Sequence, residues 1–214
     1  MTTTGLLAVL MAVSVAFVLL GERRGWRWLV LSAKPLASGC FVVVALLRYA
    51  PGDRYGTSVL VALALCLVGD VLLIFKKAFR VGLVSFLFGQ LAYAMAFHAL
   101  VPVSSWPLLP AVPLLAIGVL TARWLSPHLG EMRVPVFAYV AVISVMVWGA
   151  AAAVLGGRAT PQVVVGALLF YASDLAVARD RFVERAFVNR AIGLPLYYIG
   201  QLLLASSVGS QALG

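Results

Sequence analysis

Long apolar segments follow one another along almost the whole chain, and each is long enough to cross a lipid bilayer as a helix. A membrane-spanning helix needs about 20 mostly apolar residues, and only helices or closed barrels satisfy the backbone in lipid. Because the apolar residues run continuously and do not alternate with polar ones, we predict helices. The eight segments cover residues 4–20, 28–47, 57–75, 81–100, 106–125, 134–155, 161–178 and 191–210.

Composition and loop length indicate a single membrane domain. Hydrophobic residues make up 64% of the 214 residues and charged residues only 11%, whereas about a quarter of the residues of a soluble domain are charged. The connections between the segments are short, and no linker divides the chain. We therefore predict an all-α polytopic membrane protein with eight transmembrane helices, in which residues 1–214 form one integral membrane domain.

The basic residues predict how the chain is oriented. Three of them lie in the loops after the second, fourth and sixth segments, but twelve lie in the loops after the odd-numbered segments. Loops rich in Lys and Arg stay in the cytoplasm, so we expect both termini on the outer side of a bacterial inner (cell) membrane. These loops account for the net charge of +9, and we predict no nucleic-acid partner. The twelve residues are Arg23, Arg24, Arg27, Lys76, Lys77, Arg80, Arg123, Arg133, Arg179, Arg181, Arg185 and Arg190.

Several polar side chains lie inside the apolar segments, at similar distances from the basic loops. An ionisable group within a span costs about 2.5–3.5 kcal/mol on insertion scales and is a functional candidate. At a rise of ~1.5 Å per residue, Asp70, Asp174 and Lys34 lie ~8–10 Å from these loops, and Gln90 and Gln201 lie ~15 Å from them. We predict that they line one polar pocket. The alternatives are a purely structural Lys34–Asp70 ion pair and glutamines that only join helices.

A short pattern occurs twice, in the third and fourth segments and again in the seventh and eighth. The first copy is "VGDVLL" (68–73) followed by "FGQLAYA" (88–94), and the second is "ASDLAV" (172–177) followed by "IGQLLLA" (199–205). Each copy has a small residue before Asp, then a basic loop, then Gly-Gln-Leu. Because both pairs of segments cross in the same direction, we infer a parallel 4+4 internal repeat that makes Asp70 and Asp174 equivalent.

Two carboxyl groups close together in a medium of low dielectric supply a general acid and a general base, because one of them tends to keep its proton. Such a pair suits protonation of an acid-labile bond, followed by attack of water on an oxocarbenium-like carbon. Lys34 would stabilise the ionised form of one carboxyl group or bind a phosphate. Tyr93, Tyr197 and Tyr198 would orient water or a headgroup.

The histidines favour no metal site. The chain has two, His98 and His128, on different segments, so a three-histidine zinc site is excluded, whereas mixed ligation is not. Counted along the helix, His98 lies ~27 Å from the cytoplasmic loop. It would reach the pocket only if its helix were broken or tilted.

Five short stretches carry a family resemblance. They are "AKPLA" (33–37), "GDVLL" (69–73), "FLFGQLAYAMAFH" (86–98), "GALLFYASDLAVA" (166–178) and "YYIGQLLLA" (197–205). In this order and combination they resemble the YhhN-like membrane family, which includes the animal lysoplasmalogenases. The resemblance implies eight transmembrane helices and hydrolysis of the vinyl-ether bond of a lysophospholipid, giving a fatty aldehyde and a glycerophospho-headgroup compound, without a metal or an organic cofactor.

The resemblance also assigns roles to residues of this chain. It implies that Asp70 and Asp174 are the catalytic carboxyl groups. Together with the polar residues counted above, it gives a set of substrate-binding candidates: Lys34, Gln90, Tyr93, His98, Ser173, Tyr197, Tyr198 and Gln201. The leading hypothesis is a membrane-embedded hydrolase with a lysophospholipid substrate and membrane lipids as its surroundings. The alternatives are a proton-coupled transporter of a small lipid-like solute, and a lipid-binding or structural membrane protein.

Overall fold

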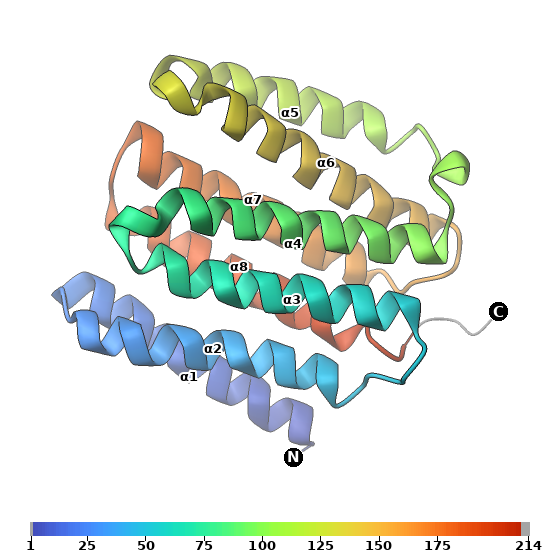
Figure 1. Cartoon of the computed structure of the whole chain (residues 1–214), viewed down its shortest axis with the longest axis horizontal. Coiled ribbons are helices and arrows are strands. Elements are labelled where there is room, and N and C mark those ends of the chain that lie inside the picture. The colour runs from blue at the N-terminus through green and yellow to red at the C-terminus, as the bar shows by residue number, and fades with distance from the viewer. Residues whose placement is uncertain (1, 211–214) are drawn as a thin grey trace.

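The computed structural model describes residues 2–210, which contain eight α-helices and no β-strand (Figure 1). Short 3₁₀ turns precede α4, α5 and α6, and a π-helical turn, Arg179–Val183, follows α7. The prediction of an all-helical chain is therefore confirmed. The helices are α1 (Thr3–Arg24), α2 (Arg27–Leu46), α3 (Arg54–Leu73), α4 (Phe79–Leu100), α5 (Ala111–Leu125), α6 (Arg133–Leu155), α7 (Gln162–Ala178) and α8 (Phe187–Ser206).

Six of these helices, namely α1, α2, α3, α4, α6 and α7, are long and apolar enough to cross a membrane. The other two are less suited to it. Helix α5 has 15 residues, which span ~22 Å at ~1.5 Å per residue, less than the ~30 Å hydrocarbon core. Helix α8 carries Asn189 and Arg190 near its start. The protein is an integral membrane protein, and its eight membrane spans stay a prediction.

Helix α5 begins later than the sequence pattern predicts, at Ala111 and not at residue 106. Two prolines, Pro107 and Pro110, lie in the intervening stretch. Proline lacks the backbone N–H and its ring disfavours a helical residue before it. The indole nitrogen of Trp106 donates a hydrogen bond to the Val101 carbonyl at 2.9 Å, so this stretch turns back on the end of α4 instead.

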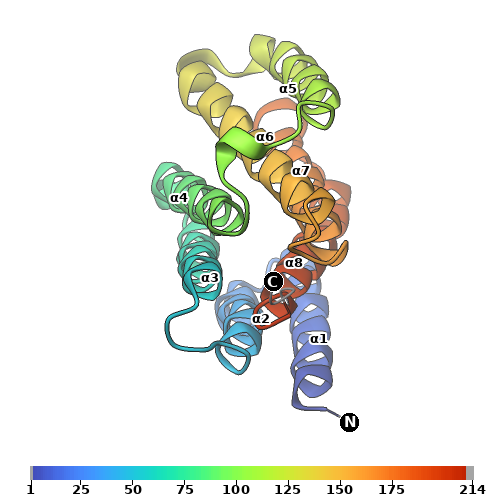
Figure 2. The same ribbon diagram turned by 90° about the vertical axis from the view of Figure 1, so that its right-hand side faces the viewer.

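Six helices surround the interior and two lie outside them. Helices α3 and α4 form one antiparallel hairpin, and α7 and α8 form another. Helix α2 packs against α3 and α8, and α6 packs against α4 and α7, so that the two hairpins are joined on both sides. Figure 2 shows α1 and α5 at opposite extremes, where α1 packs on α2 and α8, and α5 packs chiefly on α6.

Glycines allow the two helices of each hairpin to approach closely. A Cβ atom built on Gly200 of α8 would lie 2.8 Å from the backbone oxygen of Gly166 in α7. In the other hairpin, a Cβ atom on Gly89 of α4 would lie 3.3 Å from the backbone oxygen of Ala62 in α3. Gly89 and Gly200 each precede a glutamine directly, so the close approach also sets where these two glutamines lie.

Replacing Gly200 with alanine is expected to destabilise the protein, because the methyl group would overlap the Gly166 carbonyl and force α7 and α8 apart. Overpacking of this kind typically costs ~1–3 kcal/mol. Gly39 in α2 has nothing within 4 Å of an added Cβ, so Gly39→Ala should be neutral or stabilising by up to about 1 kcal/mol. Thermal unfolding in detergent measures both variants. An equal Tm for Gly200→Ala and Gly39→Ala would contradict this packing.

Candidate active site

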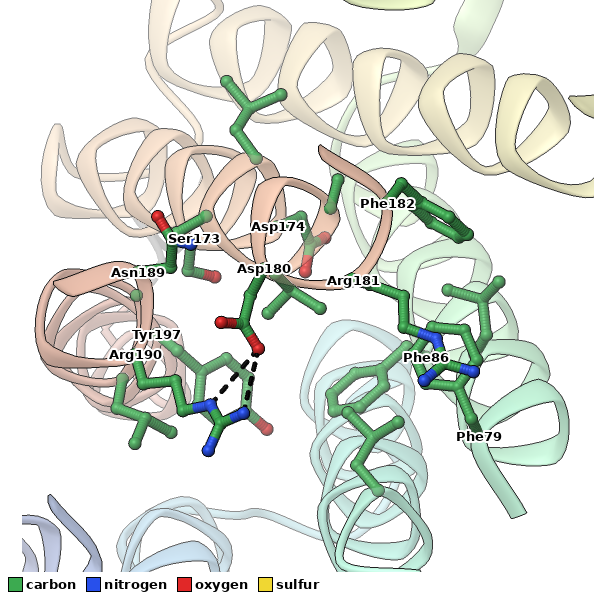
Figure 3. Close-up of a pocket in the computed structure, with 18 of the residues that line it drawn as sticks. Phe79, Phe86, Ser173, Asp174, Asp180, Arg181, Phe182, Asn189, Arg190 and Tyr197 are labelled. Carbon is green, nitrogen blue, oxygen red and sulfur yellow. Dashed lines mark hydrogen bonds and ion pairs between the residues drawn. The ribbon is translucent and has the colours of Figure 1, made fainter. Parts of the chain in front are cut away.

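A cavity of about 1080 Å³ lies at the end of the bundle where α1, α3, α5 and α7 end and the loops after them begin. We call this the basic end, because twelve Lys and Arg residues lie there. All eight helices contribute to the cavity walls, and both Asp70 and Asp174 line it. Figure 3 shows Asp174 of α7 directed into the cavity, with Tyr197 of α8 and Phe86 of α4 on neighbouring walls. Helices α3 and α7 therefore bring their carboxyl groups to one shared space.

Asp70 is buried and holds contacts from two other helices. Its Oδ1 lies 3.3 Å from Nζ of Lys34 in α2. Its Oδ2 accepts hydrogen bonds at 2.7 Å from Oγ of Ser38 in α2 and from the hydroxyl of Tyr197 in α8. Ser38 Oγ also lies 3.2 Å from the hydroxyl of Tyr198. A paired charge whose oxygens are all hydrogen-bonded recovers much of the cost of being buried.

Asp174 is half-buried, and its hydrogen-bond partners are neutral. The hydroxyl of Tyr139 in α6 donates to Oδ2 at 2.9 Å, and Nε2 of Gln90 in α4 donates to the same oxygen at 3.0 Å. Within residues 2–210, no Lys or Arg lies within ion-pair distance of Asp174, and its Oδ1 accepts no hydrogen bond. The two carboxyl groups therefore differ: Asp70 has a cation beside it, whereas Asp174 has only neutral donors and one free oxygen.

The hydrogen bonds of the site cross between the two hairpins. Gln90 of the α3–α4 hairpin donates to Asp174 of the α7–α8 hairpin, and Tyr197 of the α7–α8 hairpin donates to Asp70 of the α3–α4 hairpin. Deeper in the bundle, the hydroxyl of Tyr93 in α4 donates to Oε1 of Gln201 in α8 at 2.6 Å. Each aspartate is thus held by a side chain from the hairpin that does not carry it.

The structure sorts most of the predicted site residues into two groups. Four are fully buried behind the cavity wall, where they contact the lining residues or one another: Gln90, Tyr93, Tyr198 and Gln201. Five line the cavity itself: Lys34, Asp70, Ser173, Asp174 and Tyr197.

The structure does not bring His98 to the cavity. Helix α4 runs unbroken from Phe79 to Leu100, so the break that would carry His98 toward the aspartates is absent. His98 is exposed at the far end of α4, and its Nδ1 accepts a hydrogen bond from the backbone N–H of Val103 at 3.2 Å. There it accepts the hydrogen bond of a backbone N–H group in the turn that follows the helix.

Two residues of the site, Tyr139 and Ser38, were not predicted, although the sequence holds a signal for each. Tyr139 follows Arg133 by six residues, which places it ~9 Å from the basic loop, at the same depth as Asp70. Ser38 follows Lys34 by four residues, about one helical turn, so both side chains lie on the same face of α2. The depth of a side chain and the face of the helix that carries it follow from the sequence in this way. The neighbouring helix that the side chain contacts does not.

Charged residues at the rim of the cavity fasten three elements together. Arg190 of α8 contacts Glu22 of α1 and lies 3.2 Å from Asp180 of the π-helical turn (Figure 3). In the same region, Arg179 lies 2.9 Å from Glu184. The sequence indicates that the loop with Arg179, Arg181, Arg185 and Arg190 is an orientation signal, with attraction of anionic lipid phosphates as the alternative. The structure also gives Arg179 and Arg190 acidic partners, and those of Arg190 join α1, the turn and α8.

Comparison of the sequence with known proteins identifies the family of the chain. A sequence model of the YhhN family matches residues 26–208. The chain belongs to the YhhN family. The match covers both aspartates, their partners and all five stretches that carry the resemblance, so the family prediction is confirmed.

Individual relatives are similar over most of their length. Lysoplasmalogenase TMEM86B of Rattus norvegicus is 32% identical over 189 residues, which cover 87% of this chain and 75% of the rat protein. Lysoplasmalogenase TMEM86A of Homo sapiens is 31% identical over 207 residues, with 92% and 85% coverage. The uncharacterized membrane protein YhhN of Escherichia coli O157:H7 is 28% identical over 190 residues, with 86% and 89% coverage. No solved structure matches the chain significantly.

Proposed function

We propose that the protein is a hydrolase that cleaves the vinyl-ether bond of lysoplasmalogen-type lysophospholipids within the membrane. The observation that carries the proposal is the pair of unlike carboxyl groups, Asp70 and Asp174, on the walls of one cavity. Vinyl-ether hydrolysis needs an acid to protonate carbon and a base to activate water, and unlike environments separate these two roles. The relatives named lysoplasmalogenase support the substrate class.

The first step assigned here is proton transfer from Asp174 to the alkene carbon farther from the ether oxygen. Asp174 is the acid because it contacts no cation among residues 2–210, and a carboxyl group that is partly removed from water without one favours its neutral form. Tyr139 and Gln90 both donate to Oδ2, which leaves Oδ1 to carry the proton. The transfer creates an oxocarbenium ion at the carbon bonded to the ether oxygen, and a carboxylate on Asp174.

The second step assigned here is addition of water to that carbon, with Asp70 accepting the proton of the water. Lys34, Ser38 and Tyr197 hold the Asp70 carboxylate ready for this. The hemiacetal then breaks down: its hydroxyl proton passes to Asp174, and the ether oxygen takes the proton from Asp70 as the carbon–oxygen bond breaks. Aldehyde and alcohol leave, and both carboxyl groups return to their starting states.

The packing of the helices supports the proposed 4+4 repeat. If α1–α4 correspond to α5–α8, the contact of α2 with α3 matches that of α6 with α7, and the contact of α2 with α8 matches that of α6 with α4. Lys34 in α2 then corresponds in place to Tyr139 in α6, since each lies beside the aspartate of the following helix. Asp70 and Asp174 would then occupy equivalent positions in the two halves. The cation beside Asp70 and the neutral hydroxyl beside Asp174 would give them different protonation states.

The proposal is tested by incubating the purified protein in detergent with an alkenyl lysophosphatidylethanolamine and following the lipid by mass spectrometry. We expect equal amounts of fatty aldehyde and glycerophosphoethanolamine. A proton-coupled transporter and a lipid-binding protein both predict that the lipid is recovered chemically unchanged. Recovery of intact lipid by protein that keeps its helical circular dichroism would therefore reject the hydrolase.

Tyr139→Phe is expected to lower kcat about tenfold, because it removes one of the two hydrogen bonds that orient the Asp174 carboxyl group. A hydrogen bond of this kind is worth ~1–2 kcal/mol, and ~1.4 kcal/mol is tenfold in rate. The matched control is Tyr49→Phe, which removes a hydroxyl 3.1 Å from Oγ1 of Thr57 near the opposite end of the bundle. Equal kcat values for the two variants would contradict a positioning role for Tyr139.

A further inference from the structure

Three basic residues on one side of the cavity rim lie together and have no acidic partner among the described residues. Lys76 and Lys77 lie in the turn before α4, and Arg181 lies in the π-helical turn after α7. All three line both the main cavity and an adjoining recess of about 190 Å³. No acidic side chain in the described part of the chain lies within ion-pair distance of them, in contrast to Arg190 and Arg179.

Arg181 is held in a defined position. Its guanidinium carbon lies 4.2 Å from the centre of the Phe79 ring, and the Phe79 and Phe182 rings meet edge to face with centres 6.2 Å apart. Figure 3 shows Arg181 directed toward Phe79, on the opposite side of the opening from the Arg190–Asp180 pair. A guanidinium stacked on a ring keeps its N–H groups free in its own plane, where they suit a phosphate.

We propose that Arg181, together with Lys76 and Lys77, binds the phosphate of the lysophospholipid substrate, an inference that rests on the proposed function. The unpaired charge supplies the attraction, and the stacked guanidinium supplies the direction. The adjoining recess gives the headgroup room beside the entrance. On the other side of the rim, Arg190 is already paired with Glu22 and Asp180, and Arg181 is the rim arginine that a ring holds in place, so the phosphate is drawn to the side formed by α4 and the π-helical turn.

The dimensions of the substrate agree with this placement. Helix α3 ends at Leu73, so the helix carries the chain ~4.5 Å beyond Asp70, and Lys76 follows in the 3₁₀ turn after three more residues. At up to ~3.3 Å per residue, these put the backbone of Lys76 between about 5 and about 14 Å from that of Asp70. In an extended lysoplasmalogen, the glycerol backbone and ether oxygen separate the phosphorus from the reacting alkene carbon by roughly 8–9 Å, at single-bond lengths near ~1.5 Å. A phosphate at the rim therefore puts the vinyl ether at the level of the aspartates. The apolar lining, which includes Phe86, Val140 and Ile143, is left for the alkenyl chain.

The test compares two substrates in detergent micelles free of anionic lipid: an alkenyl lysophosphatidylethanolamine, and the corresponding alkenylglycerol, which has the vinyl ether but no phosphate. The measured quantity is the ratio of kcat/KM for the first substrate to kcat/KM for the second. The variants are Arg181→Gln, Arg181→Lys and the control Arg24→Gln. Arg24 is exposed at the same end of the bundle but does not line the cavity.

We expect Arg181→Gln to lower this ratio about tenfold, Arg181→Lys to restore part of it, and Arg24→Gln to leave it at the wild-type value. A ratio that is the same in wild type and Arg181→Gln overturns the phosphate site. A second result also overturns it: a loss of kcat/KM in Arg181→Gln that is equal for both substrates and arises only in vesicles containing anionic phospholipid. That result would mean that Arg181 binds membrane lipid and not the substrate. Release of aldehyde from neither substrate by the wild type would instead refute the hydrolase itself.

Discussion

Asp174→Asn is expected to abolish aldehyde release, lowering kcat by ~10²–10⁴-fold, the range that a general acid contributes. The amide has no proton acidic enough to pass to carbon, yet it has the shape of the carboxyl group and its oxygen can still accept from Tyr139 and Gln90. The fold should therefore persist. Mass spectrometry of the released aldehyde, together with a Tm close to that of the wild type, measures both expectations.

Asp53→Asn is the matched control for this substitution. Asp53 caps the start of α3 at the other end of the bundle, where its Oδ1 accepts from the backbone N–H of Tyr55 at 3.0 Å. Asparagine caps a helix about as well as aspartate, so this variant should keep full activity. Turnover by Asp174→Asn within a few-fold of Asp53→Asn would remove Asp174 from the mechanism, and with it the division of roles between the two carboxyl groups.

The sequence predicted the level of the site better than its partners. Depth along a helix follows from the constant rise per residue, and this is why Asp70, Asp174 and Lys34 were expected near one another and do line one cavity. Rotation about the helix axis depends on packing between helices, which no single segment specifies. The contact of Tyr139 with Asp174 is of this second kind, because it depends on how α6 meets α7.

The position of His98 also follows from its depth along the helix. Its depth count of ~27 Å places it at the far end of α4, whereas the resemblance to the family includes it among the pocket residues. The structure follows the count: α4 is continuous, and His98 ends at a turn outside the cavity. For a residue in an unbroken membrane helix, the distance along the axis is the stronger guide.

The apolar pattern predicted the helices better than their ends, because turn-forming residues decide where a helix begins or ends. The apolar residues predict that the first helix ends at residue 20, whereas α1 continues to Arg24 and ends where Gly25 adopts a left-handed conformation at the C-cap. At the start of α5, apolar residues favour a helix while Pro107 and Pro110 oppose it, and the prolines prevail. Hydropathy alone could not weigh these two effects, because it ignores the missing N–H of proline.

Lys34→Met is expected to destabilise the protein strongly, because it leaves the Asp70 carboxylate buried without its cation. The side chains of Lys34 and Asp70 are only 11% and 3% exposed, so water screens the pair little. Removing one partner of such a pair typically costs ~3–5 kcal/mol. Thermal unfolding in detergent should show a much lower Tm, and activity should fall with it, since Asp70 would take up a proton or move.

The double variant Lys34→Met/Asp70→Asn decides whether this pair is structural or catalytic. It removes both charges, and a neutral replacement of a buried pair is often as stable as the original, so most of the lost Tm should return. If the pair only joined α2 to α3, aldehyde release would return as well. We expect it not to, because no carboxylate is left at this position to accept the proton of water, and recovery of both stability and turnover would reject Asp70 as the base.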